Sequence, residues 1–273
     1  MGKQIKITIS VLGCGWLGMP LAEELLQKGY SVNGSTTTSE KIETLEKKGI
    51  DAFYIELTEE EVKGEVFSFL DGAEALIVDV PPGLRKEPNT SFVKKLKHFM
   101  TKLELSSVEK VILVSSTSVF EDQESIPEYS ETSTPNGKSS ASKQIQEVEK
   151  LFQNNPNFKT TVIRMGGLLG GDRHPVKFLA GRQDVANPQA PVNLIQQQDA
   201  IHLILKVLQQ EKFGEVFHGV YPLHPSKKEY YSAKAKELNV EPPAFDTASI
   251  TKGKKISSTN TQKELEFVFR DEI

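Results

Sequence analysis

Apolar and polar residues follow two different patterns along the first half of the chain. Short, almost continuously apolar runs, such as ALIVDV at 75–80, are typical of strands that helices cover on both faces. Longer amphipathic stretches, with an apolar residue at about every third or fourth position, separate these runs and indicate helices. The predicted strands are 5–12, 30–36, 52–56, 75–80, 111–115 and 160–164, and the predicted helices are 18–28, 39–48, 89–105, 138–152 and 198–210.

The alternation of strands and helices predicts an α/β fold built on a doubly wound, Rossmann-type parallel sheet. The helix at 39–48 has Ser39 as its expected N-cap, and Lys47, Lys48 and Gly49 form a typical helix end. After residue 164 glycines and prolines crowd a segment with little periodicity, which indicates irregular structure over a site. We therefore expect residues 1–165 to form an NAD(P)-binding domain. Residues 166–273 are expected to form a small, mixed substrate-binding region of the same structural unit.

Composition narrows the class of protein. The chain has 273 residues, and 33 Lys and Arg against 37 Asp and Glu give a net charge of −4, which offers no electrostatic footprint for nucleic acid. The single cysteine, Cys14, excludes an intramolecular disulfide and a cysteine-cluster metal site. No apolar run approaches the ~20 residues of a membrane span, and the N-terminal apolar stretch reads as a first strand rather than a signal peptide. A cytoplasmic protein that binds neither membranes nor nucleic acid is the expectation.

The strongest motif is Gly-Cys-Gly-Trp-Leu-Gly at 13–18, which follows a predicted strand and opens a predicted helix. Gly13 would allow a tight turn, Gly15 a close approach of the backbone to a pyrophosphate, and Gly18 close packing of helix against strand. The helix N-terminus, with Trp16 and Leu17 in the same loop, would supply amides and a partial positive charge to the anion. The motif predicts a dinucleotide site.

The end of the second predicted strand bears on which dinucleotide binds. An NAD site usually has an acidic residue there, ~20 residues after the glycines, and this chain has Thr36, Thr37 and Thr38 instead. These hydroxyls, with Lys41 one turn into the next helix, favour NADP, although the expected arginine is missing and NAD stays an alternative. Pro81 and Pro82 follow the fourth predicted strand. They are expected either to line the site beside the nicotinamide ribose or to form a rigid turn without ligand contact.

These motifs and several later ones together resemble the short-chain dehydrogenase/reductase superfamily, in its extended and atypical branch of NAD-dependent epimerase/dehydratase-like proteins. The resemblance covers nearly the whole chain. Its landmarks are the glycine loop, VSSTSVF at 114–120, RMGGLLG at 164–170, VNLI at 192–195 with DA at 199–200, and a closing segment with KISS at 255–258 and EL at 264–265.

The resemblance implies a set of catalytic residues. Ser116 falls on the family's serine position, which orients the substrate hydroxyl, and Lys143 on the lysine position, which holds the coenzyme ribose. The position of the family's tyrosine acid/base is then Ser139, whose hydroxyl is a poor replacement for a phenol. Tyr129 in the preceding loop, and less favourably Tyr221, are alternative phenols. Without a ligand role, either would be a half-buried loop aromatic.

Further residues of the sequence are candidates for binding a ligand or a metal. His174, Arg173 and Arg182 lie where the family's substrate region begins, so an arginine there is a candidate clamp for a phosphate or carboxylate. The five histidines show no zinc-binding spacing, so no metal site is expected. Cys14 at a helix start is a candidate for a lowered thiol pKa, although a small residue that fills the loop is the simpler interpretation.

The resemblance therefore implies an NAD(P)-binding oxidoreductase or epimerase-like protein that acts on a small polar, nucleotide-linked substrate without the usual tyrosine. The alternative is a non-catalytic sensor that binds NAD(P)(H) and regulates a partner. The helices at 89–105 and 138–152 form a dimer interface in many relatives, but four lysines on the first of them argue against its burial. A monomer and a homodimer both stay open.

Overall fold

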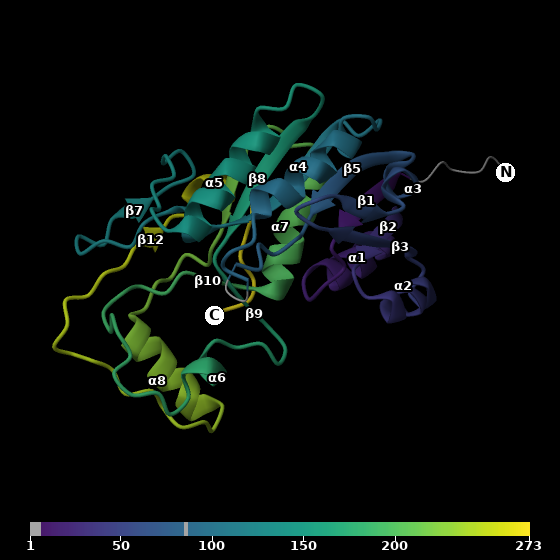
Figure 1. Ribbon diagram of the computed structural model, residues 1–273. Helices are drawn as coiled ribbons and strands as arrows, with labels where there is room; N and C mark the ends of the chain where they lie inside the picture. Colours follow the sequence, from purple (N-terminus) through teal and green to yellow (C-terminus); the bar gives the residue numbers. More distant parts are fainter. Residues whose placement is uncertain (1–6, 85–86) are drawn as a thin grey trace. The chain divides into compact units, whose positions relative to one another are not determined.

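The computed structural model describes residues 7–84 and 87–273, and its largest element is a mostly parallel sheet (Figure 1). Its strands, in their order across the sheet, are β11 (Val216–Gly219), β8 (Lys159–Met165), β6 (Lys110–Ser116), β5 (Ala73–Val78), β1 (Thr8–Leu12), β2 (Ser31–Thr36), β3 (Asp51–Leu57) and β4 (Val62–Gly64). Strand β1 pairs in parallel with β2 on one side and β5 on the other, and only β4 is shown to run antiparallel to its neighbour, β3. The chain thus builds outward from β1 to β4 and then returns to β5 beside β1. This reversal confirms the predicted doubly wound, Rossmann-type fold.

Contacts divide the chain into two compact units. The first unit comprises Met1–Ser115, Ser139–Ile163 and Val207–Glu215, and the second comprises Ser116–Lys138, Arg164–Lys206 and Val216–Ile273. The roles expected of residues 1–165 and 166–273 stay predictions.

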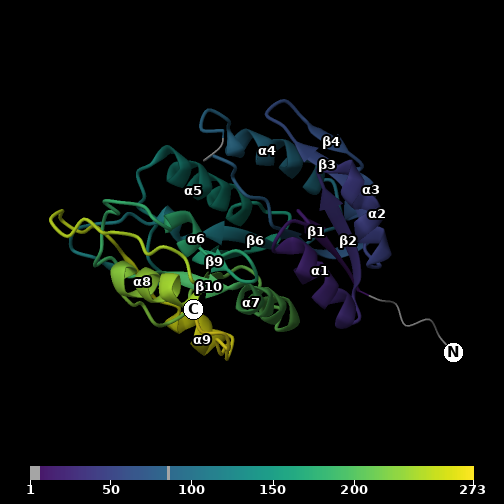
Figure 2. The ribbon, with the colours of Figure 1, turned by 90° about the horizontal axis from the view of Figure 1, so that it is seen from below.

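The first unit holds most of the sheet and the helices that cover it. Its strands are β1 (Thr8–Leu12), β2 (Ser31–Thr36), β3 (Asp51–Leu57), β4 (Val62–Gly64) and β5 (Ala73–Val78), with β6 (Lys110–Ser116) and β8 (Lys159–Met165) reaching its boundary. Its helices are α1 (Gly18–Gln27), the 3₁₀ turn η1 (Ser39–Lys41), α2 (Ile42–Lys47), α3 (Val66–Leu70), α4 (Phe92–Leu103) and α5 (Ser140–Gln153). Figure 2 shows α1 on one face of this sheet and α4 with α5 on the other. Strands β1 and β5 are therefore buried on both faces, as their apolar sequences predicted.

The six predicted strands and five predicted helices are all present, with boundaries shifted by a few residues. Residues 5 and 6 of the first predicted strand lie outside the described residues. The short elements β4 and α3 were not predicted. Ser39 is not the cap expected of it, because the helix begins as η1 with Thr38 in the N-cap position. The predicted helix end is correct, since Gly49 adopts φ +83 and donates to Glu46 O over 2.9 Å.

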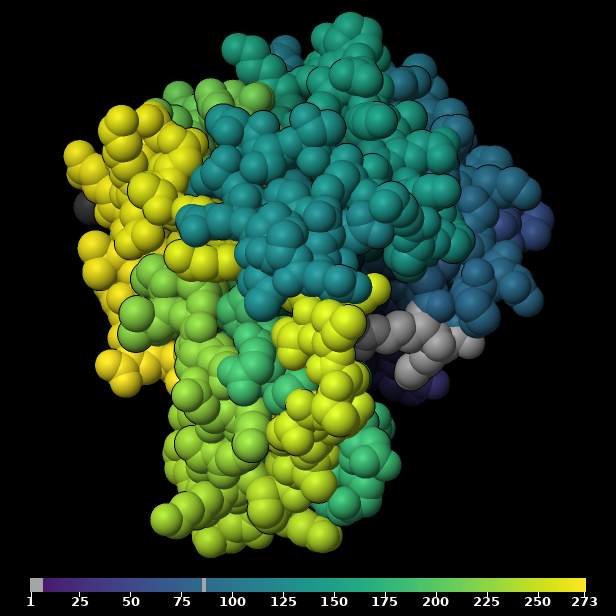
Figure 3. Space-filling view, turned by 90° about the vertical axis from the view of Figure 1, so that its left-hand side faces the viewer, coloured from purple at the N-terminus to yellow at the C-terminus, as the bar shows by residue number. Residues whose placement is uncertain are grey.

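The second unit consists of short elements joined by long loops. These are η2 (Thr117–Val119), β7 (Glu128–Tyr129), β9 (Gly167–Leu169), α6 (Val176–Leu179), β10 (Leu194–Gln196), β11 (Val216–Gly219), α8 (Lys227–Glu237), β12 (Lys255–Ile256) and α9 (Thr259–Glu264), while α7 (Gln197–Gln209) runs on into the first unit. Strand β12 pairs with β7, so the closing segment (yellow) lies against the segment at 116–138 (teal) in Figure 3. A second pair, β9 and β10, borders a small core that includes Val176, Leu194 and Tyr230.

Candidate functional site

The loop between β1 and α1 lies at the carboxyl end of β1, where the order of the sheet reverses. Gly13 has φ +105, and a Cβ there would overlap the carbonyl oxygen of Asp79. A Cβ on Gly18 would overlap the carbonyl oxygen of Gly13, whereas a Cβ on Gly15 would have nothing within 4 Å. The three glycines thus meet three different steric demands: a left-handed turn, an open approach and close packing. Their arrangement fits a pyrophosphate at the start of α1, which has no acidic residue in its first turn.

Strand β2 holds this loop in place through hydrogen bonds to Ser35. Ser35 accepts two bonds from it: its side-chain oxygen from the Gly13 amide over 2.9 Å, and its carbonyl oxygen from the Cys14 amide over 2.7 Å. Deeper in the sheet, Asn33 and Ser10 both donate to the carbonyl oxygen of Phe69, over 2.8 Å and 2.6 Å. Ser35 therefore fixes the glycine loop, whereas Asn33 links β2 to Ser10 of β1 and to Phe69 of α3.

The thiol of Cys14 is buried in the loop. Burial, together with the negative charge of Asp79, raises the pKa of Cys14 to about 12. Its sulfur fills the space beside Gly34, where a Cβ would lie only 2.7 Å from it. The suggestion of a lowered thiol pKa was wrong, because desolvation dominates over the helix start. Cys14 is a small residue that fills the loop.

The end of β2 turns outward after Thr36. Thr36 is buried, and its hydroxyl accepts from the Thr38 amide over 3.1 Å, whereas Thr37 and Thr38 are exposed. Lys41 is exposed one turn later. This end of the strand offers hydroxyls and one ammonium group, and no carboxylate from Asn33 to Ser39.

The turn after β5 contains Pro81, which is exposed, and Pro82, which is half-buried. Gly83 follows with φ +72, and its carbonyl accepts from the Glu87 amide over 3.1 Å. The chain is therefore non-helical at the prolines, as expected. Their contact with a coenzyme stays a prediction.

Ser139, Lys143 and Ser116 occupy the three positions that are catalytic in the family the chain resembles. Their surroundings differ. Ser139 is the N-cap of α5, where its hydroxyl accepts from the Ser142 amide over 3.1 Å. Lys143 is exposed in the first turn of α5, and it forms no ion pair with the part of the chain that the structure describes. Ser116 caps the turn η2 by accepting from the Ser118 amide over 3.1 Å. Ser139 is thus a helix-start hydroxyl, and the catalytic roles of Ser116 and Lys143 stay predictions.

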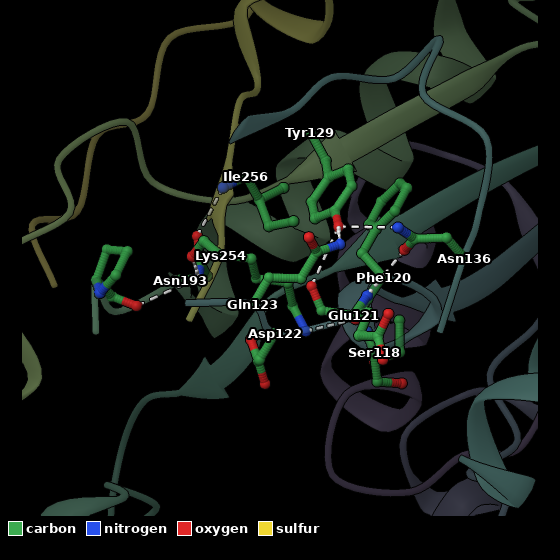
Figure 4. Close-up of polar contacts among 12 residues, drawn as sticks. Ser118, Phe120, Glu121, Asp122, Gln123, Tyr129, Asn136, Asn193, Lys254 and Ile256 are labelled. Carbon is green, nitrogen blue, oxygen red and sulfur yellow. Dashed lines mark hydrogen bonds and ion pairs between the residues drawn. The ribbon is translucent and has the colours of Figure 1, made fainter. Parts of the chain in front are cut away.

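Tyr129 lies within the second unit, and only 8% of it is exposed (Figure 4). Its hydroxyl accepts from the side-chain amides of Gln123 over 3.1 Å and Asn136 over 2.9 Å, and it donates to Glu121 O over 3.2 Å. The ring stacks on Phe120, with 4.6 Å between centroids and 11° between planes. A swing of this side chain toward a substrate would break all of these contacts. These contacts make Tyr129 a structural group of the second unit, and its catalytic role stays a prediction.

Asn193 joins the closing segment to the same network (Figure 4). The side-chain Nδ2 of Asn193 donates to Lys254 O over 2.9 Å, and its side-chain Oδ1 accepts from the Ile256 amide over 2.9 Å. Lys254 in turn donates to Phe120 O over 2.7 Å and pairs with Asp122 at 3.3 Å. The ammonium group of Lys254 is therefore part of the structure of this unit.

The predicted substrate region contains His174, which is half-buried. Its Nδ1 accepts from the Val176 amide over 3.1 Å, so Nε2 carries the hydrogen that is donated to the Tyr230 hydroxyl at 3.1 Å. Burial lowers the pKa of His174, which keeps the ring neutral. Arg173 and Arg182 are exposed, and the ring of Tyr221 meets that of Phe269 edge-on. The ligand roles of these residues stay predictions.

The second unit also has an open hollow of about 400 Å³ beside the Tyr129 network. Charged residues dominate its lining, and two ion pairs cross it: Glu121 with Lys138 at 2.9 Å and Glu124 with Lys252 at 3.4 Å. Among the described residues, no three of His, Cys, Asp and Glu gather in a way that could hold a metal ion. No helix in the described ranges is long and apolar enough to span a membrane.

Two residues of the glycine loop's surroundings were missed in the sequence. Ser35 was not predicted to contact the loop, because it lies on a strand that is distant from the loop in sequence. Asp79 was not singled out at all. A signal was present, because Asp79 is the one ionisable residue in the apolar run at 75–80.

Comparisons with known proteins agree with this fold and loop. Residues 8–134 match the family described as the NAD binding domain of 6-phosphogluconate dehydrogenase. Among solved structures, UDP-glucose 4-epimerase from Thermotoga maritima, with UDP-glucose, has a TM-score of 0.77 at 16% identity, over 97% of this chain and 94% of that one. UDP-glucuronic acid 4-epimerase from Bacillus cereus, in complex with NAD, has a TM-score of 0.75 at 14% identity, over the same shares.

The fold and the glycine loop together define an NAD-binding Rossmann protein with the architecture of NAD-dependent epimerases and dehydratases. Protein YeeZ from Escherichia coli K12 is 30% identical over 264 residues, which cover 96% of this chain and 95% of that protein. The chain belongs to the family of Protein YeeZ. The expected likeness to NAD-dependent epimerase/dehydratase-like proteins is confirmed.

Proposed function

We propose that the chain binds NADP(H) in preference to NAD(H) and uses it as an oxidoreductase or epimerase-like protein on a small polar, nucleotide-linked substrate. The observation that carries the coenzyme preference is the end of β2, where Thr37, Thr38 and Lys41 are exposed. A carboxylate at this place would accept bonds from a ribose 2′-hydroxyl and repel a 2′-phosphate. Hydroxyls and an ammonium group favour the phosphate instead.

Trp16, the chain's single tryptophan, lies half-buried in the glycine loop and makes the preference measurable. Titration of its fluorescence with NADPH and NADH is expected to give tighter binding of NADPH. Lys41→Ala should weaken NADPH about fivefold and leave NADH unchanged, since an exposed ion pair contributes up to about 1 kcal/mol. Thr37→Asp should weaken NADPH further by adding a repelling charge. Lys94→Ala, an exposed lysine on α4, is the matched control.

The outcomes separate the parts of this proposal. Equal affinity of the wild type for both coenzymes, with no effect of Lys41→Ala, would contradict the proposed preference for NADPH. It would still support the proposed dinucleotide site. No binding of either would remove the whole proposal. A thermal shift checks the result independently, because a ligand at 100 times its Kd adds ~2.7 kcal/mol to the free energy of unfolding.

The reaction part of the proposal rests on the resemblance to two sugar-nucleotide epimerases, one in a structure with UDP-glucose and the other in complex with NAD. When bound, a nicotinamide coenzyme supplies hydride transfer. Lys143 would hold the coenzyme ribose, and Ser116 would orient the substrate hydroxyl. Ser139 supplies no phenol, and its hydroxyl already caps α5. The proton would therefore pass to or from a water or another hydroxyl.

Hydride transfer can be tested without knowing the final product. UDP-glucose or UDP-glucuronic acid labelled with deuterium at the sugar C4 position is incubated with the protein and NADP⁺. Oxidation of the sugar hydroxyl to a ketone moves the label to the nicotinamide, and this label exchange is followed by mass spectrometry. We expect exchange above the rate without protein, and its loss in Lys143→Ala while Lys150→Ala retains it. Both lysines are exposed on α5, so the pair controls for removal of charge from this helix.

A second candidate is a non-catalytic sensor of NADP(H). The fixed Tyr129 and the capping role of Ser139 favour it, because neither side chain is disposed as a proton-transfer group. For a sensor, the coenzyme binds tightly and stabilises the fold, but no sugar nucleotide promotes label exchange. Exchange that depends on Lys143 would exclude this candidate.

A further inference from the structure

Asp79 lies directly against the glycine loop from the end of β5. Its amide donates to Leu12 O over 2.9 Å, which extends the pairing of β5 with β1 by one residue. A Cβ on Gly18 would stand 3.1 Å from Oδ2 of Asp79. The carboxylate of Asp79 therefore lies beside Gly18, the first residue of α1. The main-chain carbonyl of Asp79 occupies the space that a Cβ on Gly13 would need.

The charge of Asp79 acts on this part of the loop. After burial, it is the second cause of the raised pKa of the Cys14 thiol, two residues before Trp16. The first turn of α1 carries no acidic side chain of its own. Asp79 thus brings a negative charge to a helix start whose partial positive charge, roughly half an elementary charge, favours anions.

We infer that Asp79 sets coenzyme affinity through like-charge repulsion: its carboxylate opposes the pyrophosphate at the start of α1. This inference rests on the proposed function, because it concerns the same site. The helix start stabilises one anion close by, so a second anion binds there against the charge of the first. Asp79 is therefore an affinity-determining residue that keeps binding of the dinucleotide weaker than the glycine loop alone would make it.

The repulsion has a definite chemical signature. It acts on the pyrophosphate, which NADPH and NADH share, and not on the 2′-phosphate, which distinguishes them. Removal of the charge should therefore tighten both coenzymes by about the same factor, whereas changes at Lys41 act on NADPH only. For charges several ångströms apart near a protein surface, the expected factor is about tenfold. A ligand without phosphate should not respond.

The test compares the wild type with Asp79→Asn, which keeps the shape of the side chain and removes its charge. Trp16 fluorescence and titration calorimetry measure the Kd for NADPH, NADH and adenosine. Asp71→Asn is the matched control, because Asp71 is exposed just before β5, at the strand's other end. Thermal unfolding of each variant confirms that it is folded, and Asp79→Ser replaces Asp79→Asn where the amide variant does not fold.

The inference predicts about tenfold tighter binding of both coenzymes in Asp79→Asn, with adenosine and the Asp71→Asn variant unchanged. Unchanged affinity would overturn it. Weaker binding would also overturn it, and would identify Asp79 as an acceptor for a coenzyme hydroxyl. If the wild type binds the coenzymes and Asp79→Asn binds them with the same Kd, only this inference fails. Where the wild type binds neither coenzyme, the proposed function fails with it.

Discussion

The glycine loop of the first unit and the Tyr129 network of the second are held together in opposite ways. In the loop, main-chain groups approach so closely that Gly13 and Gly18 have no room for a side chain, and Gly15 stays open. In the network, polar side chains satisfy one another, and the Tyr129 hydroxyl has three partners. The loop leaves room for a ligand, whereas the polar groups of the network already hydrogen-bond to one another. A residue type that suits catalysis is therefore no evidence of a catalytic site unless its polar atoms are available.

The largest expected effect tests the steric half of this comparison. Gly18→Ala places a methyl group on the carbonyl oxygen of Gly13, so the start of α1 must move away from β1. We expect a loss of roughly 3 kcal/mol in the free energy of unfolding, together with loss of coenzyme binding. Urea unfolding measures the first and Trp16 fluorescence the second.

Gly15→Ala is the internal control for this change, because its methyl group meets no atom within 4 Å. Its unfolding free energy should stay close to that of the wild type, while coenzyme affinity falls. Equal stability of Gly18→Ala and Gly15→Ala would show that the close packing of the loop is not what requires glycine there.

A smaller effect is expected in the network. Tyr129→Phe removes the shared hydroxyl and leaves the amides of Gln123 and Asn136 without it, which should cost about 1.5 kcal/mol of stability. Coenzyme affinity should not change. Tyr221→Phe is the control, since Tyr221 is half-buried against Phe269 outside this network. A Tyr129→Phe variant of unaltered stability that loses label exchange would instead support the catalytic role predicted for Tyr129.

The smallest effect concerns pH and the loop's thiol. The pKa of Cys14 is raised from 9.0 to about 12, so the native state keeps a proton that the unfolded state loses first. The stability from this thiol is complete below pH 9 and is lost as pH rises from there through 12. At pH 9 the loss relative to pH 7 is about 0.4 kcal/mol.

Urea unfolding at pH 7, 9 and 10 in the wild type and in Cys14→Ala measures this contribution. The difference in stability between the two proteins should shrink as the pH rises. A constant difference would mean that the native thiol ionises as readily as the unfolded one. Native Cys14 should also react slowly with a thiol reagent at pH 8, because the thiolate is the reactive form.

The sequence was most informative where local sterics and periodicity decide the structure. Apolar runs gave the parallel strands, and the positions of Gly13, Gly15 and Gly18 gave the steric plan of the loop, because a strand–turn–helix with that spacing has few alternatives. It was less informative about the start of the helix after β2. There Ser39 was expected as the cap, but the helix begins as the 3₁₀ turn η1 with Thr38 in the N-cap position, and the Thr38 amide donates to the Thr36 hydroxyl.

What the sequence by itself determined is therefore the α/β class, the order of its strands and helices along the chain, and the coenzyme loop. All of these follow from the chain's local preferences and from its pattern of burial. Only the tertiary structure decided that Ser35 and Asp79 support the loop, that Cys14 is inert, and that Tyr129 is fixed. Each of these depends on contacts between residues distant in sequence, or on burial, and burial decides both the pKa of a thiol and the partners of a phenol.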